Sequence, residues 1–110
     1  MSGWEAQLRK GVVELAVMAS IGSGETYGYR IVAQLQELAG LEFTESTVYP
    51  VLARLARDGF LAIRVEESPS GPKRRYYRLT SAGQIRLRRI ADCWRTISES
   101  LKGLLEGAKT

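Results

Sequence analysis

The chain has 110 residues, of which 45% are hydrophobic and 25% charged, and this balance predicts one compact domain, or one domain with an arm, rather than a disordered segment. It contains no histidine and a single cysteine, Cys93, which excludes an intrachain disulfide and a cysteine-rich zinc site and favours a reducing cytoplasm. The 16 basic and 12 acidic residues give a net charge of +4, which favours an anionic partner. No nucleophile–base pair, metal cluster or phosphate loop is recognisable, so we expect neither an enzyme nor a bound cofactor or metal.

The first predicted element is a helix over residues 4–21, ended by the glycines at 22 and 24. Its basic start and apolar run imitate a signal peptide, but Glu5 and Glu14 interrupt the run, which is shorter than the roughly 18 residues of a membrane span. We therefore expect a buried helix without export signal or membrane contact. The predicted inward face carries Trp4, Leu8, Val12, Leu15 and Ala19, widened by Val13, Val17 and Ile21.

Two shorter helices are predicted next. Thr26 is the expected N-cap of a helix that stops at Gly40. Its inward residues are Ile31, Val32, Leu35 and Leu38. A third helix begins near residues 44–47 and closes at Asp58 and Gly59, where glycine is free to adopt a positive φ.

The third helix is predicted to bury Val48, Val51, Leu52 and Leu55. Pro50 is expected in its first turn, because a proline deeper in a helix removes a hydrogen bond and kinks it. The outward face then carries Ser46, Thr47, Pro50, Arg54 and Arg57, with Tyr49 beside the helix start.

A β-hairpin is predicted from two alternating segments around a Pro/Gly-rich turn. The first strand covers residues 61–67, the turn residues 68–72 and the return strand residues 74–79. Residues expected on the inner face are Leu61, Ile63, Val65, Tyr77 and Leu79.

The last predicted element is a helix over residues 81–105, capped by Thr80 and about 37 Å long at 1.5 Å per residue. Apolar residues recur along it three and four apart, which is typical of a helix seam. These are Leu87, Ile90, Trp94, Ile97, Leu101 and Leu104. The element order predicts a mainly α (α+β) fold, a winged helix-turn-helix over residues 1–80 with a long C-terminal dimerisation helix over residues 81–110.

Positive charge is concentrated in the hairpin region. Residues 64–89 hold eight basic and two acidic residues, so this segment carries +6 and the remainder −2. Lys73, Arg74 and Arg75 follow the turn, where they suit a phosphate backbone or a minor groove. A charged edge strand that resists aggregation is the alternative interpretation. The neighbouring helix start, with Ser46, Thr47 and Tyr49, suits the major groove, and we therefore favour nucleic acid.

Four segments resemble the PadR family of bacterial transcriptional regulators, in the same order along the chain. They are residues 27–31 (YGYRI), 46–55 (STVYPVLARL), 59–61 (GFL) and 74–83 (RRYYRLTSAG). The single C-terminal helix is similar to that of the compact subgroup. The resemblance implies a homodimeric repressor that binds a palindromic operator. It also implies DNA contacts by the start of the third helix, by the hairpin, which is the wing of this fold, and by Tyr27 with Lys10. The expected DNA-binding residues are Lys10, Tyr27, Ser46, Thr47, Tyr49, Pro50, Arg54, Lys73, Arg74 and Arg75.

A partner copy is the expected cover for the apolar seam. The predicted dimer interface comprises Trp4, Leu8, Leu87, Ile90, Trp94, Ile97, Leu101 and Leu104. The alternative is that the seam lies wholly against the chain's own first helix. Similarity to compact PadR proteins further implies a pocket where Trp94, facing Trp4, stacks a small aromatic effector, although we favour a tryptophan that simply fills the interface. The alternative function is a winged-helix protein-interaction adaptor without sequence-specific DNA binding.

Overall fold

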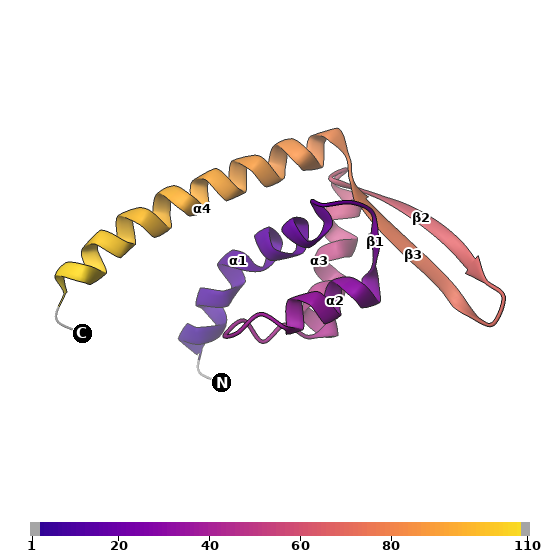
Figure 1. The fold of residues 1–110 in the computed structure, drawn as a ribbon, viewed down its shortest axis with the longest axis horizontal. Coiled ribbons are helices and arrows are strands. Elements are labelled where there is room, and N and C mark those ends of the chain that lie inside the picture. The colour runs from indigo at the N-terminus through magenta and orange to yellow at the C-terminus, as the bar shows by residue number, and fades with distance from the viewer. Residues whose placement is uncertain (1–2, 109–110) are drawn as a thin grey trace.

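The computed structural model describes residues 3–108 as four helices and a small sheet (Figure 1). The four helices and the hairpin follow one another in the predicted order, and a short strand at residues 26–27, which was not predicted, joins the hairpin. The elements are α1 (Gly3–Ile21), β1 (Thr26–Tyr27), α2 (Gly28–Gln36), α3 (Glu45–Arg57), β2 (Leu61–Ser68), β3 (Gly71–Leu79) and α4 (Ser81–Gly107). The three strands form an antiparallel sheet in the order β1-β3-β2. Among the described residues, no helix is both long enough and apolar enough to cross a membrane.

The hydrophobic core lies between α1, α2, α3 and the root of the sheet. Its fully buried side chains come mainly from the helices: Val17, Met18, Ile21, Ile31, Val48, Leu52 and Leu55. The sheet contributes Leu61 and Tyr77 from the ends of β2 and β3 nearest the helices. The core therefore holds the hairpin by its root only, and the rest of the hairpin projects from the body.

The predicted inward face of α1 is wrong in part. The structure buries Val13, Val17 and Ile21, whereas Trp4 and Leu8 are 68% and 71% exposed. Ala19 is also exposed, and Val12 and Leu15 are half-buried. Both faces of α1 carry apolar residues, so the sequence alone is compatible with the burial of either face. The contacts of α1 with α2 and α3 select one of them.

The start of α2 also differs from the prediction. Thr26 is not the N-cap, because its backbone pairs with Tyr77 in the sheet, and Tyr27 occupies the cap position without a side-chain hydrogen bond. The helix ends at Gln36, and Leu38, predicted to face inward, is exposed in the turn that follows. Gly40 adopts a positive φ of 83° within this connection.

The start of α3 places Pro50 later than expected. The helix begins at Glu45, so Pro50 is its sixth residue and the prediction of a first-turn proline is wrong. Proline has no backbone N–H, so the carbonyl of Ser46 lacks its usual helical hydrogen bond from residue 50. Ser46 and Pro50 are both exposed, so this unpaired carbonyl is not buried in the core. The predicted end is confirmed, since Gly59 follows the helix with a φ of 85°.

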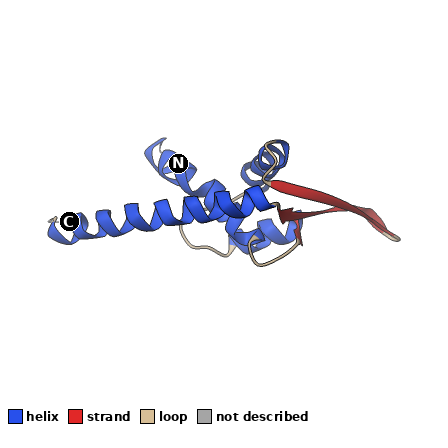
Figure 2. Ribbon diagram, turned by 90° about the horizontal axis from the view of Figure 1, so that it is seen from above, coloured by secondary structure: helices blue, strands red, loops and turns tan. Residues whose placement is uncertain are grey.

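The hairpin pairs Leu61 with Leu79 at its root and Ser68 with Gly71 at its tip. Tyr77 is buried and Leu79 is half-buried against the core, as predicted. The prediction that Ile63 and Val65 face the core is wrong, because both are exposed. Figure 2 shows the reason: the hairpin extends past the helical body, so only its root has a core to pack against.

Thr80 caps α4 as predicted. Its Oγ1 accepts a hydrogen bond from the Gly83 backbone N–H at 3.0 Å and donates one to the Gly59 carbonyl at 2.7 Å. Only the first two seam residues, Leu87 and Ile90, pack against the core. The later ones, Trp94, Ile97, Leu101 and Leu104, are between 47% and 71% exposed. The seam therefore does not lie wholly against the chain's own α1, and the second half of α4 extends away from the body (Figures 1 and 2).

Candidate nucleic-acid interface

A groove of about 740 Å³ lies between the start of α2, the start of α3 and the distal half of the hairpin. Tyr27 and Tyr49 line it from the helices, and Lys73, Arg74 and Arg75 line it from β3. The structure thus brings the predicted hairpin cations and one residue of the predicted recognition helix to a single surface. These segments are more than twenty residues apart in sequence.

Hydroxyl groups cluster at the N-terminus of α3. Thr44 Oγ1 lies 2.9 Å from Ser46 Oγ and 3.1 Å from Thr47 Oγ1, and all three residues are exposed. The first N–H groups of a helix have no intrahelical partner and carry the positive end of its dipole. This end of α3 can therefore donate hydrogen bonds to phosphate or base acceptors.

The ring of Tyr49 packs over the backbone of Gly28. A Cβ at residue 28 would lie only 2.8 Å from Tyr49 Cε1. Burial, together with the negative charge of Glu45, raises the pKa of the Tyr49 hydroxyl above its ordinary value. The start of α2 thus supports the side of α3 that faces the groove.

The three hairpin cations differ in their surroundings. Lys73 Nζ lies 3.5 Å from Glu67 Oε1, and both side chains are well exposed, so this pair is weak. The Arg74 guanidinium lies 5.0 Å from the centre of the Tyr27 ring. Arg75 is exposed and has no acidic partner within residues 3–108. All three positive charges are therefore available to an anion in the groove.

Arg64, another cation of the basic segment, is committed to the protein itself. It lies 2.7 Å from Glu25 and 2.6 Å from Glu66, and stacks 4.5 Å from the centre of the Tyr76 ring. The hydrogen bond from Arg64 lowers the pKa of the Glu25 carboxyl, while Glu25 and Glu66 raise the pKa of Arg64. Tyr76 in turn meets Tyr27 edge-on at 5.7 Å. This set of contacts holds the hairpin against β1 and the start of α2.

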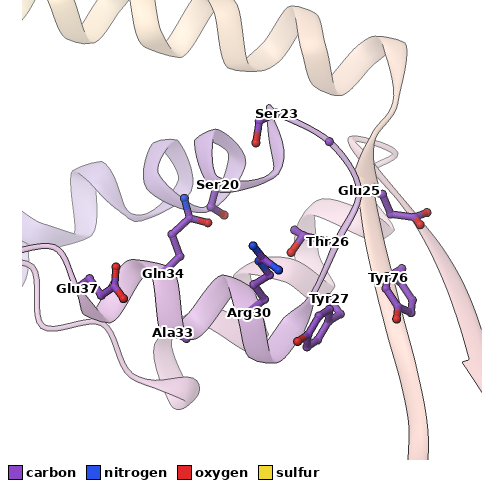
Figure 3. A pocket seen from close by; sticks show the side chains of 11 residues that line it. Ser20, Ser23, Glu25, Thr26, Tyr27, Arg30, Ala33, Gln34, Glu37 and Tyr76 are labelled. Carbon is purple, nitrogen blue, oxygen red and sulfur yellow. The ribbon is translucent and has the colours of Figure 1, made fainter. Parts of the chain in front are cut away.

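A second cavity, of about 710 Å³, lies on the other side of Tyr27, between the end of α1, β1 and α2. Figure 3 shows Arg30 extending from α2 toward the segment that carries Thr26, with Tyr27 and Tyr76 side by side at one edge. The sequence interpretation gave no site role to Arg30, Glu25 or Tyr76. Nothing in the local sequence pattern of Glu25 indicates its partner Arg64, which is 39 residues away.

Three of the predicted DNA-binding residues border a different cavity. Lys10 and Arg54 line a third cavity, of about 540 Å³, between α1, α3 and α4. Thr47 also borders this cavity, at the start of α3. Arg54 Nη2 lies 3.0 Å from Glu14 Oε1, so its guanidinium is directed toward α1 rather than to the groove. The sequence analysis noted Glu14 only as an interruption of the apolar run, although a carboxylate flanked by apolar residues in a helix expected to be buried needs a partner.

A helical body with a projecting hairpin beside the start of its third helix defines a winged helix-turn-helix protein, here with a long C-terminal helix. The predicted fold class is confirmed. The chain belongs to the Transcriptional regulator PadR-like family, whose sequence pattern matches residues 17–89.

Solved structures of similar proteins agree with this assignment. The chain is 34% identical to a Streptococcus transcriptional regulator, over 89% of this chain and 96% of the other, with a TM-score of 0.77. It is 30% identical to a PadR-like transcriptional regulator from Bacillus cereus, over 93% and 99% of the two chains, with a TM-score of 0.81. A Bacillus subtilis PadR, whose structure was solved in complex with operator DNA, is 28% identical over 71% of this chain and 45% of its own, with a TM-score of 0.63.

Proposed function

We propose that this chain is a sequence-specific DNA-binding repressor that binds a palindromic operator as a homodimer. The observation that carries the proposal is the groove shared by Tyr49 of α3 and by Lys73, Arg74 and Arg75 of the hairpin. The complex of the similar Bacillus subtilis PadR with operator DNA supports it. No catalytic role is part of the proposal.

In the proposed complex, the N-terminus of α3 enters the major groove with Ser46, Thr47, Tyr49 and Pro50. The hairpin cations lie along the phosphate backbone or in the adjacent minor groove, where their main effect is counterion release. Tyr27 borders the same groove and is placed to approach a phosphate. Lys10, near Thr47 on the side of α3 toward α1, is the proposed contact at the other edge of the interface.

The proposed dimer forms through residues 81–110. The second half of the α4 seam and the start of α1 present apolar side chains to solvent, including Trp4, Leu8, Trp94 and Leu101. Two winged domains must read half-sites about 34 Å apart, which one copy cannot do. A second copy covering these residues supplies both the burial and the second reading surface.

Trp94 and Trp4 are the proposed location of a small aromatic effector, since an exposed indole offers a flat face for stacking. In the simpler version of the proposal, Trp94 only fills the dimer interface. Binding of a planar dye, followed by the anisotropy of the dye's own fluorescence, that is seen with wild type but lost in Trp94→Leu favours the effector site. Equal dye binding by both proteins favours the simpler version.

The test of DNA binding uses duplexes selected from a random pool by the wild-type chain, with scrambled duplexes for comparison. Fluorescence anisotropy between about 50 and 200 mM salt gives the affinity and its salt slope. We expect the triple variant Lys73→Ala, Arg74→Ala, Arg75→Ala to bind both duplexes at least roughly tenfold more weakly, with a salt slope smaller by about 2 to 3.

The matched control removes three exposed cations from α4: Arg88→Ala, Arg89→Ala, Arg95→Ala. Its net charge changes equally, but its residues lie outside the groove, so its salt slope should stay close to that of wild type. Equal losses in both triple variants contradict the placement of DNA in the groove. A wild-type chain that is monomeric in light scattering and selects no duplex supports the adaptor function instead.

A further inference from the structure

A single carboxylate joins three helices. Glu14, in the middle of α1, accepts contacts from Arg54 Nη2 of α3 at 3.0 Å to Oε1 and from Arg86 Nε of α4 at 3.0 Å to Oε2. The Glu14 side chain is only 18% exposed, whereas the two arginines are 41% and 44% exposed. Each carboxylate oxygen thus holds one cation from a different element.

This carboxylate lies where direct packing is sparse. α3 and α4 both pack on α1 and make few contacts with each other. The cavity of about 540 Å³ opens at this junction, bordered by Thr47 at the start of α3 and Ile90 of α4. Arg86 is also held from the other side, 5.1 Å from the centre of the Phe60 ring. The start of α4 is fixed to the segment after α3 by the hydrogen bond from Thr80 to the Gly59 carbonyl, and Glu14 adds a second link between the two helices through α1.

We propose that Glu14 is a positioning residue for DNA recognition: it fixes the reading helix α3 relative to the arm helix α4, acting through Arg54 and Arg86. The inference deepens the proposed function and rests on it. It also changes the role assigned to Arg54, which positions α3 from within the protein and does not contact DNA.

The reason is geometric. In a dimer joined through α4, the separation and angle of the two α3 helices depend on how each α3 sits on its own α4. A loose junction leaves each copy able to bind phosphates but spreads the pair over several orientations, and only one of these matches two half-sites. Specific binding then falls while non-specific binding does not, because the latter requires charge but not register.

The sign of the effect separates this role from simple electrostatics. Removing a carboxylate from a DNA-binding protein should, by charge alone, strengthen binding to every duplex. Loss of Glu14 also leaves Arg54 and Arg86 as two neighbouring cations without their shared acceptor, so both are free to move apart. The positioning role predicts weaker binding to the selected duplex in spite of the more favourable net charge.

The experiment compares Glu14→Gln with Glu37→Gln, an exposed glutamate that forms no ion pair among residues 3–108. The readout is the ratio of affinities for the selected and scrambled duplexes. We expect Glu14→Gln to lower this ratio about tenfold, with scrambled-duplex affinity unchanged or higher, and Glu37→Gln to leave the ratio as in wild type. A Glu14→Gln protein that binds both duplexes equally well or better, in parallel with Glu37→Gln, overturns the inference.

Arg54 provides the second arm of the test. Arg54→Ala should lower the affinity ratio as much as Glu14→Gln does, without changing the salt slope. The double variant should have a ratio no lower than that of either single variant. Arg54→Lys should recover most of the ratio that Arg54→Ala loses. A salt slope smaller by about 1 in Arg54→Ala shows a phosphate contact and overturns the assignment.

Thermal unfolding of each variant shows whether a change in its DNA binding comes from a folding defect. Should Glu14→Gln fail to fold, Arg86→Ala breaks only the α4 side of the junction and is expected to lower the same ratio. A wild-type chain that does not distinguish the two duplexes contradicts the proposed function and this inference together. Wild-type specificity retained in Glu14→Gln and Arg86→Ala contradicts the inference alone.

Discussion

Gly28 and Tyr49 are packed so closely that a side chain at residue 28 would displace the Tyr49 ring. A Cβ there would lie 2.8 Å from Tyr49 Cε1 and 3.2 Å from its hydroxyl oxygen. The contact joins the first residue of α2 to the helix α3 at the groove that we propose for DNA. It makes the orientation of an exposed tyrosine dependent on a glycine 21 residues earlier in the sequence.

Gly28→Ala should therefore displace the Tyr49 ring and weaken binding to the selected duplex. Because Tyr49 is 40% exposed, its ring can rotate away, and the free energy of unfolding should change by at most about 1 kcal/mol. Anisotropy and urea unfolding measure the two effects. The control Gly11→Ala lies in α1 with no atom within 4 Å of its new Cβ. It should gain up to about 1 kcal/mol of stability and bind as wild type. Wild-type binding by Gly28→Ala would contradict the role of this contact.

Tyr27 should act through its ring as well as its hydroxyl, because Arg74 stacks on it. Tyr27→Phe removes the proposed phosphate contact alone, whereas Tyr27→Leu also releases Arg74, so operator affinity should fall in two steps. In an Arg74→Ala background the second step should disappear, since residues in contact are not additive. Anisotropy on all six combinations checks this. A difference between Phe and Leu that persists without Arg74 argues that the ring acts on something else.

Gly83→Ala should be the most damaging single glycine substitution in α4. Its Cβ would overlap the carbonyl oxygen of Phe60 and lie 3.0 Å from the carbonyl carbon, and backbone atoms cannot move aside as a side chain can. We expect a loss of about 3 kcal/mol in the free energy of unfolding, measured in urea. Gly103→Ala, in the same helix with no atom within 4 Å of its Cβ, should instead be neutral or stabilising. Similar midpoints for the two variants would refute the close approach.

The ion pairs of Glu14 should make stability depend on pH in the acid range. Burial raises the pKa of the Glu14 carboxyl, but the hydrogen bonds and charges of Arg86 and Arg54 outweigh it, and the net pKa lies below the ordinary value of 4.5. A carboxyl with a lowered pKa stabilises the folded state above its unfolded pKa, and this contribution is lost as pH falls through the folded pKa.

Wild type should therefore lose more unfolding free energy than Glu14→Gln between about pH 5 and about pH 3. Urea unfolding at a series of pH values gives both curves. Glu25→Gln is the comparison, because the pKa of Glu25 is also lowered, by Arg64, in a more exposed pair. Wild-type and Glu14→Gln curves that run parallel across this range would show that Glu14 has the same pKa in both states.

Much of the fold and half of the candidate site were readable in the sequence, because they depend on short-range patterns. The Thr80 cap, the Gly59 turn and the buried Tyr77 follow from residues within a few positions of one another. The basic hairpin and the hydroxyl-rich start of α3 are likewise local features. Four segments that resemble PadR proteins, in the same order along the chain, then indicated the family, which the match over residues 17–89 confirms.

Only the tertiary structure decided which side chains meet. The tertiary contacts determine which face of α1 is buried. They leave Ile63 exposed, because the hairpin extends beyond the core, and they place Arg54 against Glu14 rather than in the groove. Periodicity specifies that a helix has an apolar face, or that a strand alternates, but not what lies opposite. That depends on elements that are as many as 72 residues apart in the chain, as Glu14 and Arg86 are, and their packing and ion pairs exist only once the whole domain has folded.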